Sequence, residues 1–224
     1  MGSSLGKKLH VLGIDDHVVV LEGYYSIFKY FETTFDELKF AKAYDCRSGY
    51  QVIQQNKDTS FDIAVLDYSI PAYPEMGLYT GEDIALLVRK TMPSCKIVMM
   101  TMHKEVDIMG RILEKIKPEG FINKSDCTTS ELIDGFRTVL DGSTYFSKTV
   151  LNFIARQESE ILLEDIDIKI ILFLAKGIKN KNLGKYIPLS DSAIEKRKYR
   201  IKRLLDVSGG DEELITKARD LGYI

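Results

Sequence analysis

Residues 61–71 read FDIAVLDYSIP, a short apolar run that ends in a carboxylate. The central run, Ile63–Leu66, is aliphatic and is bounded by charged residues, which is typical of a buried strand. A similar run in HVLGIDDH (residues 10–17) ends in Asp15 and Asp16. Both stretches therefore predict buried strands whose carboxyl ends carry acidic side chains.

Five such runs alternate with longer amphipathic segments over the first 140 residues. The predicted strands are Leu9–Ile14, Leu38–Ala43, Ile63–Leu66, Ile97–Thr101 and Gly120–Ile122. The predicted helices lie near 17–31, 48–56, 81–91, 105–116 and 129–140. This alternation predicts an α/β fold with a five-stranded parallel sheet that is covered on both faces. In such sheets the ligand site lies at the carboxyl ends of the strands.

The pattern changes after Gly142. Residues 142–163 carry one weak apolar pattern and then a charged stretch, and we interpret them as a linker that is partly helical. From Ile166 onward the pattern is helical throughout. We therefore predict an α/β domain over 8–141 and a small all-α domain over 164–224, and a length of 224 residues accommodates both.

Composition excludes several classes of protein. A net charge of -2 with 45% hydrophobic residues argues against a histone-like polycation and against an acidic disordered tail. The three cysteines, Cys46, Cys95 and Cys127, are scattered and have no histidine nearby, which argues against a zinc site and favours a reducing, cytoplasmic location. No stretch approaches the ~18 apolar residues of a membrane span, so we expect no membrane partner.

Polar side chains of matched chemistry follow the predicted strands. Asp15, Asp16 and Asp67 would meet at one edge of the sheet, where carboxylates repel one another unless a cation compensates. Such oxygen donors suit Mg²⁺. Thr101 ends the fourth strand with a hydroxyl, and Lys124 follows the fifth with an ammonium that can bind phosphate. This set predicts a phosphoryl-binding site.

Each of these residues also has an ordinary structural explanation. A single Asp after a strand is more often a helix cap or a turn residue than a ligand. Either Asp15 or Asp16 could cap the helix that follows. Five strand-end positions with matched chemistry in the right order favour the phosphoryl site over independent coincidence.

The stretches HVLGIDDH, FDIAVLDYSIP, KIVMMT and GFINKS resemble the receiver domain of two-component response regulators, over about residues 8–141. The resemblance implies a flavodoxin-like (CheY-like) fold, a sensor histidine kinase as partner, and a phosphoacceptor with Mg²⁺-dependent self-phosphorylation and autodephosphorylation rather than a turnover enzyme. The roles that it implies are phosphoacceptor for Asp67, metal ligands for Asp15, Asp16, Asp67 and the backbone carbonyl of Ser69, switch residues for Thr101 and Phe121, and phosphoryl binding for Lys124.

Two nearby features stay open. The stretch 72–80 is longer than usual for the family and sits beside Asp67, so it is either a tolerated loop insertion or an element that screens the site or contributes to kinase recognition. His103 follows Thr101 by two residues and is placed to influence a hydrolytic water, although an exposed histidine is commonly inert.

A basic helix behind a turn marks the second predicted domain, in the stretch AKGIKNKNLGKYIPLSDSAIEKRKYRIKRLLDV (175–207). Ser190 is a plausible N-cap after the Pro188-Leu189 turn. At 100° per residue, apolar residues 194, 201, 204 and 205 share one face, and basic residues occupy others. A charge run alone is usually a solvated surface, but a helix–turn–helix with a basic front suits the DNA major groove.

The segment from about 164 to 224 resembles the LuxR-type (NarL/FixJ) helix-turn-helix domain, on LAKGIKNK, Leu189-Ser190 and the closing ELITKARDLGYI. The resemblance implies binding to double-stranded promoter DNA and a homodimer when phosphorylated, often through a final helix such as 211–220. The predicted DNA contacts are Lys196, Arg197, Arg200, Lys202 and Arg203. The family usually has Thr-Val-Lys at 193–195, where this chain has Ala-Ile-Glu. An alternative therefore stays open, in which the protein is a phosphorylation-controlled interaction module that does not bind DNA.

Overall fold

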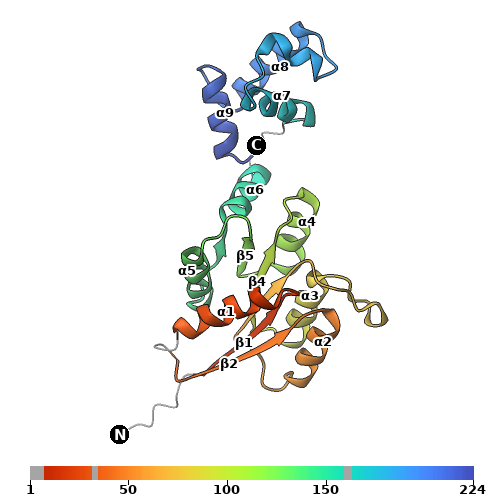
Figure 1. Cartoon of the computed structure of the whole chain (residues 1–224), viewed down its shortest axis with the longest axis vertical. Helices are drawn as coiled ribbons and strands as arrows, with labels where there is room; N and C mark the ends of the chain where they lie inside the picture. Colours follow the sequence, from red (N-terminus) through yellow and green to blue (C-terminus); the bar gives the residue numbers. More distant parts are fainter. Residues whose placement is uncertain (1–7, 32–34, 159–162) are drawn as a thin grey trace. The chain divides into compact units, whose positions relative to one another are not determined.

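The strands of the N-terminal part of the chain form one parallel sheet (Figure 1). The computed structural model describes residues 8–31, 35–158 and 163–224, and within them six strands follow the order β2-β1-β3-β4-β5-β6. The strands are β1 (Lys8–Ile14), β2 (Glu37–Ala43), β3 (Ile63–Asp67), β4 (Lys96–Thr101), β5 (Gly120–Asn123) and β6 (Tyr145–Phe146). All neighbouring strands pair in parallel, so their carboxyl ends share one edge, as predicted.

The five predicted strands are confirmed, and the sixth was not predicted. β6 pairs with β5 through Gly120↔Tyr145 and Phe121↔Phe146, so it extends the sheet by one short edge strand. Two residues are too few to show the alternation that identifies a strand, which explains why residues 142–163 read as linker. The chain divides into two units, with the boundary between Val150 and Leu151.

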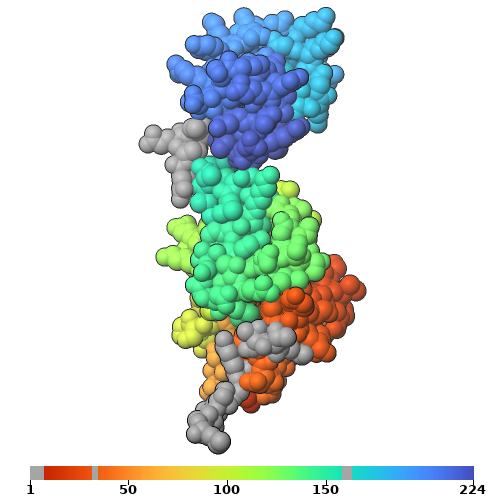
Figure 2. All heavy atoms as spheres, turned by 90° about the vertical axis from the view of Figure 1, so that its left-hand side faces the viewer, coloured from red at the N-terminus to blue at the C-terminus, as the bar shows by residue number. Residues whose placement is uncertain are grey.

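Helices cover both faces of the sheet in the first unit (Figure 1). The helical elements are α1 (Val18–Tyr30), α2 (Cys46–Gln55), η2 (Pro74–Met76), α3 (Gly81–Thr91), α4 (Val106–Arg111), the π-helical turn η3 (Ile112–Ile116), α5 (Thr129–Leu140) and α6 (Lys148–Glu158). Capping boxes at Asp45, Thr80 and Thr128 begin α2, α3 and α5 by accepting backbone hydrogen bonds from the first turn. Figure 2 shows α1, in red, and α5, in green, at the surface of this unit.

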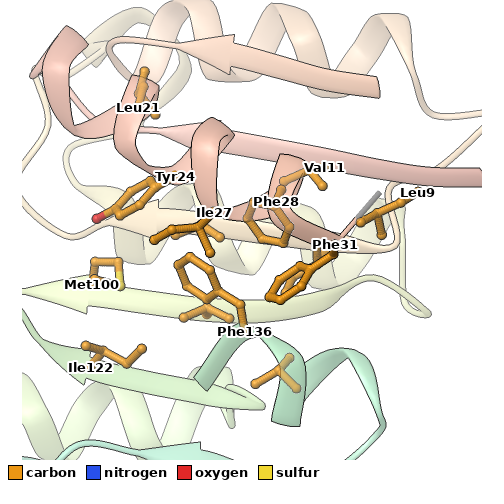
Figure 3. Close-up of a cluster of buried hydrophobic side chains, with 14 residues drawn as sticks. Leu9, Val11, Leu21, Tyr24, Ile27, Phe28, Phe31, Met100, Ile122 and Phe136 are labelled. Carbon is orange, nitrogen blue, oxygen red and sulfur yellow. The ribbon is translucent and has the colours of Figure 1, made fainter. Parts of the chain in front are cut away.

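The core beneath α1 and α5 contains a group of packed aromatic rings among aliphatic side chains (Figure 3). Phe28 of α1 stacks on Phe136 of α5 with ring centroids 4.9 Å apart, and Tyr24 meets Phe136 edge-on at 5.7 Å. Met100 and Ile122, from β4 and β5, are buried against the same cluster. Such aromatic pairs add to the free energy gained from apolar burial. The packing fixes both helices over the strands that carry the predicted site.

The second unit is helical, as predicted. Its helices are the end of α6, then α7 (Asp165–Ala175), η4 (Asn180–Lys185), α8 (Asp191–Leu204) and α9 (Asp211–Asp220). Ile194, Ile201 and Leu205 of the basic stretch are buried in its core together with Leu214 and Ala218 of α9. In the part of the chain that the structure describes, no helix has the length and apolar character needed to cross a bilayer.

Candidate functional site

Two buried carboxylates and one ammonium meet at the carboxyl edge of the sheet. Asp15 directly follows β1, Asp67 is the last residue of β3, and Lys124 directly follows β5. Lys124 Nζ lies 2.7 Å from Asp15 Oδ2 and 3.0 Å from Asp67 Oδ1. Asp15 is fully buried and Asp67 is 5% exposed. The structure thus brings together three residues that lie far apart in the sequence.

Asp16 completes the acidic group at a more exposed position. Its side chain is 36% exposed, and its Oδ1 lies 2.7 Å from His17 Nδ1. The same ring nitrogen lies 3.2 Å from Asp15 Oδ1. The donors of Asp15, Asp16 and His17 all fall within 4.8 Å of one another. The sequence reasoning did not single out His17, although its place next to the acidic pair was visible.

The charges at this site do not balance within the described residues. Burial raises the pKa of the Asp67 carboxyl; the Lys124 ammonium lowers it again only in part, and Asp15 and Asp16 add to the rise. Burial alone would lower the pKa of Lys124, but its hydrogen bond to Asp15 and the charge of Asp67 outweigh burial and raise it. Lys124 therefore stays protonated and contacts two carboxylates, Asp15 and Asp67, while the Asp16 carboxylate pairs with His17. An additional cation with oxygen ligands fits this donor set.

The two predicted switch residues are buried beside this group. Thr101 ends β4 and is 1% exposed, and its Oγ1 accepts a hydrogen bond from His103 N at 2.9 Å. The Thr101 carbonyl accepts from Lys124 N at 2.7 Å. Phe121 is fully buried in β5. Thr101 is thus joined to the main chain of Lys124, while the Phe121 ring lies inside the core.

Ser69 is exposed two residues after Asp67. Among the described residues, none donates a backbone hydrogen bond to its main-chain carbonyl. Its Oγ lies 3.0 Å from His103 Nε2, and His103 Nδ1 lies 3.1 Å from Glu105 Oε2. His103 is therefore oriented from two sides next to the site.

Gly81 lets the first turn of α3 approach the main chain of Asp67. A Cβ atom at position 81 would lie 1.9 Å from the Asp67 carbonyl oxygen. Between them, the longer stretch 72–80 folds back on itself through a bridge between Tyr73 and Leu78. Arg47 of α2 pairs with Glu75 at 3.1 Å and lies over the Tyr73 ring. The insertion is therefore tied to α2.

Two of the predicted DNA contacts are engaged within the second unit. Arg197 Nη1 lies 2.8 Å from Asp167 Oδ1, and Arg200 Nη2 lies 2.9 Å from Asp167 Oδ2. Both arginines also pair with Glu164, at 3.0 and 2.7 Å. Asp167 is fully buried, so these contacts satisfy a charge inside the unit. Sequence reasoning missed this arrangement because the acidic and basic residues lie about thirty positions apart.

The other three predicted DNA contacts, Lys196, Lys202 and Arg203, differ in whether they have partners within the unit. Lys196 and Arg203 are exposed and form no ion pair with another described residue. Lys202 Nζ donates to the Gly209 carbonyl at 3.0 Å and lies 3.4 Å from Asp211 Oδ1. Tyr199, one helical turn after Lys196, is 73% exposed. The exposed basic surface of α8 is therefore smaller than the charge run suggests.

Comparison with known families matches most of the first unit. The description "Response regulator receiver domain" fits residues 11–137, which is more than half of the chain. That range contains Asp15, Asp67, Thr101 and Lys124.

Similar proteins match over both units. The transcriptional regulatory protein MctR of Rhizobium johnstonii is 25% identical over 221 residues, covering 97% of this chain and 96% of MctR. The oxygen regulatory protein NreC of Staphylococcus haemolyticus is 26% identical, covering 88% and 91%. The response regulator UvrY of Escherichia coli is 22% identical, covering 91% of each.

Solved structures show the same fold. RcsB of Salmonella typhimurium, studied for its conformational dynamism in DNA interaction, superposes with a TM-score of 0.57 at 17% identity and covers 95% of this chain and 98% of its own. A complex of RcsB with DNA superposes with a TM-score of 0.55 at 17% identity, covering 96% and 99%. Together with the match over 11–137, the buried carboxylates and the lysine at the sheet edge, these findings show that the chain belongs to the response regulator receiver domain family.

Proposed function

We propose that this protein is the response regulator of a two-component system, in which a sensor histidine kinase phosphorylates Asp67 and thereby controls DNA binding by residues 164–224. The observation that carries the proposal is the position of Lys124, whose Nζ contacts both Asp67 and Asp15 at the sheet edge. An aspartate that is buried beside a fixed ammonium can accept a phosphoryl group whose charge the ammonium offsets. In our proposal residues 8–141 are the receiver and 142–163 the linker, and the first part of this linker adds β6 to the receiver's sheet before α6 begins.

The transfer needs few protein groups. A carboxylate oxygen of Asp67 attacks the phosphorus of a phosphohistidine, a P–O bond forms, and the P–N bond breaks with its electron pair leaving on the imidazole. Lys124 offsets charge on the phosphoryl oxygens. Mg²⁺, held by Asp15, Asp16, Asp67 and the Ser69 carbonyl, would supply further charge neutralisation and orient the phosphoryl group. Hydrolysis of the acyl phosphate would restore the Asp67 carboxylate and end the signal. In our proposal the phosphorylated protein itself is the functional product, so the protein acts as a phosphoacceptor rather than a turnover enzyme.

The acyl phosphate changes the charge at the strand ends. By analogy with other phosphorylated residues it carries roughly -1.5 to -2 charges. In our proposal the hydroxyl of Thr101 turns toward a phosphoryl oxygen, and the Phe121 ring follows into the space that it leaves. The resulting change promotes a homodimer and binding of its helical units to promoter DNA. A cytoplasmic location fits this role and the absence of any disulfide among the three cysteines.

A second candidate function has one observation in its favour. Arg197 and Arg200 already neutralise Glu164 and Asp167, and Glu195 is exposed on the same helix, where it accepts a hydrogen bond from Asn180. A helix with fewer available cations could serve a phosphorylation-controlled protein interaction instead of DNA binding. Substitution of Lys196 and Arg203 distinguishes DNA binding from a protein interaction. Both residues are exposed, and neither has an ion-pair partner among the described residues.

Labelling with acetyl phosphate and Mg²⁺ tests the phosphoacceptor. We expect one base-labile phosphoryl adduct on the wild-type protein, detected by mass spectrometry, and none on Asp67→Asn. Asp58→Asn is the matched control, because Asp58 is exposed in the segment that precedes β3, at the opposite end of that strand from Asp67. Labelling of Asp67→Asn at the wild-type level would overturn the assignment.

A further inference from the structure

The first turn of α6 is held by a carboxylate from the loop that carries Lys124. Asp126 Oδ2 accepts hydrogen bonds from Thr149 N at 2.7 Å and from Ser147 Oγ at 2.9 Å. Asp126 Oδ1 accepts from Thr149 Oγ1 at 2.8 Å. The first N–H groups of a helix have no partner within it, and an anion at that end is favoured by the helix dipole. α6 is therefore capped by a residue remote in sequence.

Ser147 ties the same point to β5. Its N–H donates to the Phe121 carbonyl at 3.0 Å, and its Oγ accepts from Asn123 N at 3.0 Å. Ser147 is 3% exposed, so these bonds are made inside the unit. Breaking them would leave buried polar groups unsatisfied, which is costly. The start of α6 is thus bonded to the strand that carries the predicted switch residue Phe121.

Lys124 and Asp126 share one tight turn. The turn is closed by Asp126 N donating to the Asn123 carbonyl at 3.0 Å, and Lys124 N donates to the Thr101 carbonyl at 2.7 Å. From this turn, the Lys124 side chain points to Asp67, and the Asp126 side chain reaches α6. A turn closed in this way has few free dihedral angles, so a shift at Lys124 is transmitted to Asp126.

We infer that Asp126 is a positioning residue that couples the phosphorylation state of Asp67 to the first turn of α6. The inference rests on the proposed function. On phosphorylation Lys124 exchanges a carboxylate partner for a phosphoryl oxygen, which supplies the different interaction in the two states that any switch requires. The turn transmits this difference through Asp126 to Thr149, and the chain continues along α6 into the second unit, which begins at Leu151. The effect of phosphorylation therefore reaches α6 through the hydrogen bonds by which Asp126 caps this helix.

Hydrogen exchange of the full-length protein tests the coupling. We expect beryllofluoride with Mg²⁺ to change exchange at amides 147–151 of the wild-type protein, together with amides 101–105. Asp126→Ala should speed exchange at 147–151 roughly fivefold without the ligand, the size expected for a lost cap. It should also abolish the response of 147–151 to beryllofluoride, while acetyl phosphate still labels Asp67 within twofold of wild type.

Asp45→Ala is the matched control, because Asp45 caps α2 through Ser48 N at 2.6 Å. It should speed exchange in α2 and leave the response of α6 intact. Asp126→Asn keeps one acceptor and should give an intermediate response, which provides a test if the alanine variant does not fold. An unchanged exchange at 147–151 while Asp67 takes the adduct, or a full response in Asp126→Ala, would overturn the coupling alone. Absence of any adduct at Asp67 would instead overturn the proposed receiver function.

Discussion

At the residue scale, Gly81 shows how closely the backbone is packed behind the phosphoacceptor. Alanine usually stabilises a helical glycine position by roughly 0.4–1 kcal/mol. Here its Cβ would lie 1.9 Å from the Asp67 carbonyl oxygen, and the atom in the way is main chain that cannot rotate aside. Overpacking of this kind costs roughly 1–3 kcal/mol. This cost exceeds the usual gain from alanine, so the substitution should destabilise the protein.

We therefore predict that Gly81→Ala lowers the free energy of unfolding by about 1–2 kcal/mol and slows labelling of Asp67 by acetyl phosphate. Urea unfolding and mass spectrometry measure the two effects. Gly23→Ala is the control, since nothing lies within 4 Å of a Cβ at that position of α1, and it should be neutral or stabilising. If Gly81→Ala were as stable as Gly23→Ala, the main chain at Asp67 would have to shift to accommodate the Cβ atom without a loss in the free energy of unfolding.

At the scale of elements, α8 carries exposed basic residues without an ion-pair partner among the described residues and arginines that pair with Asp167. Substitutions of the two kinds should have different effects. Lys196→Ala and Arg203→Ala should each reduce the slope of log affinity against log salt for DNA by about 1, because each removes one phosphate contact. Neither should change stability. Lys169→Ala on α7, also exposed, serves as the control for net charge and should leave the slope unchanged.

Arg197→Ala and Arg200→Ala should act mainly on stability. Each leaves the buried Asp167 with one partner fewer, and loss of a partner from a fully buried pair costs roughly 3–5 kcal/mol. Both arginines are partly exposed, so we expect about 1–3 kcal/mol, measured by urea unfolding. A reduced salt slope with unchanged stability would instead place these arginines at the DNA.

The α7–α8 contact also predicts a dependence on pH. Hydrogen bonds from Arg200 and Arg197 hold the pKa of Glu164 below its usual 4.5. A carboxyl whose pKa is lower in the folded state stabilises the fold above its unfolded pKa, and that stability is lost as the pH falls through the folded value. Calorimetry between pH 6 and pH 3.5 should therefore show a smaller loss of Tm for Glu164→Gln than for wild type. An identical loss would mean that Glu164 is not held by the arginines in solution.

The same elements show what a sequence can and cannot predict. The five longer strands and the strand-end residues Asp15, Asp67, Thr101 and Lys124 were predictable, because burial imposes a local pattern and parallel strands share one edge. β6 was not, because Tyr145 and Phe146 form a strand only by pairing with β5. The ion pairs of Arg197 and Arg200 with Asp167 were not predictable either, nor was the capping of α6 by Asp126. Both depend on side chains that meet only once the chain has folded.

At the scale of the whole molecule, phosphorylation and self-association should be linked. If the acyl phosphate favours a homodimer, dimerisation must favour the phosphorylated state by the same factor, because coupling between two binding equilibria is reciprocal. The near-neutral charge of -2 offers little repulsion between two copies. We therefore predict that beryllofluoride with Mg²⁺ raises the mass measured by light scattering from that of a 25.5 kDa monomer toward twice that value.

The reciprocal effect is the sharper test of this linkage. The apparent affinity for beryllofluoride should rise with protein concentration across the range in which the dimer forms. A ligand that binds the dimer more tightly than the monomer has an apparent affinity that increases with the fraction of protein in the dimer. Asp67→Asn should show neither the change in mass nor the change in affinity. A dimer that forms equally with and without beryllofluoride would leave the affinity independent of concentration, and control by Asp67 would then have to act within a constant dimer.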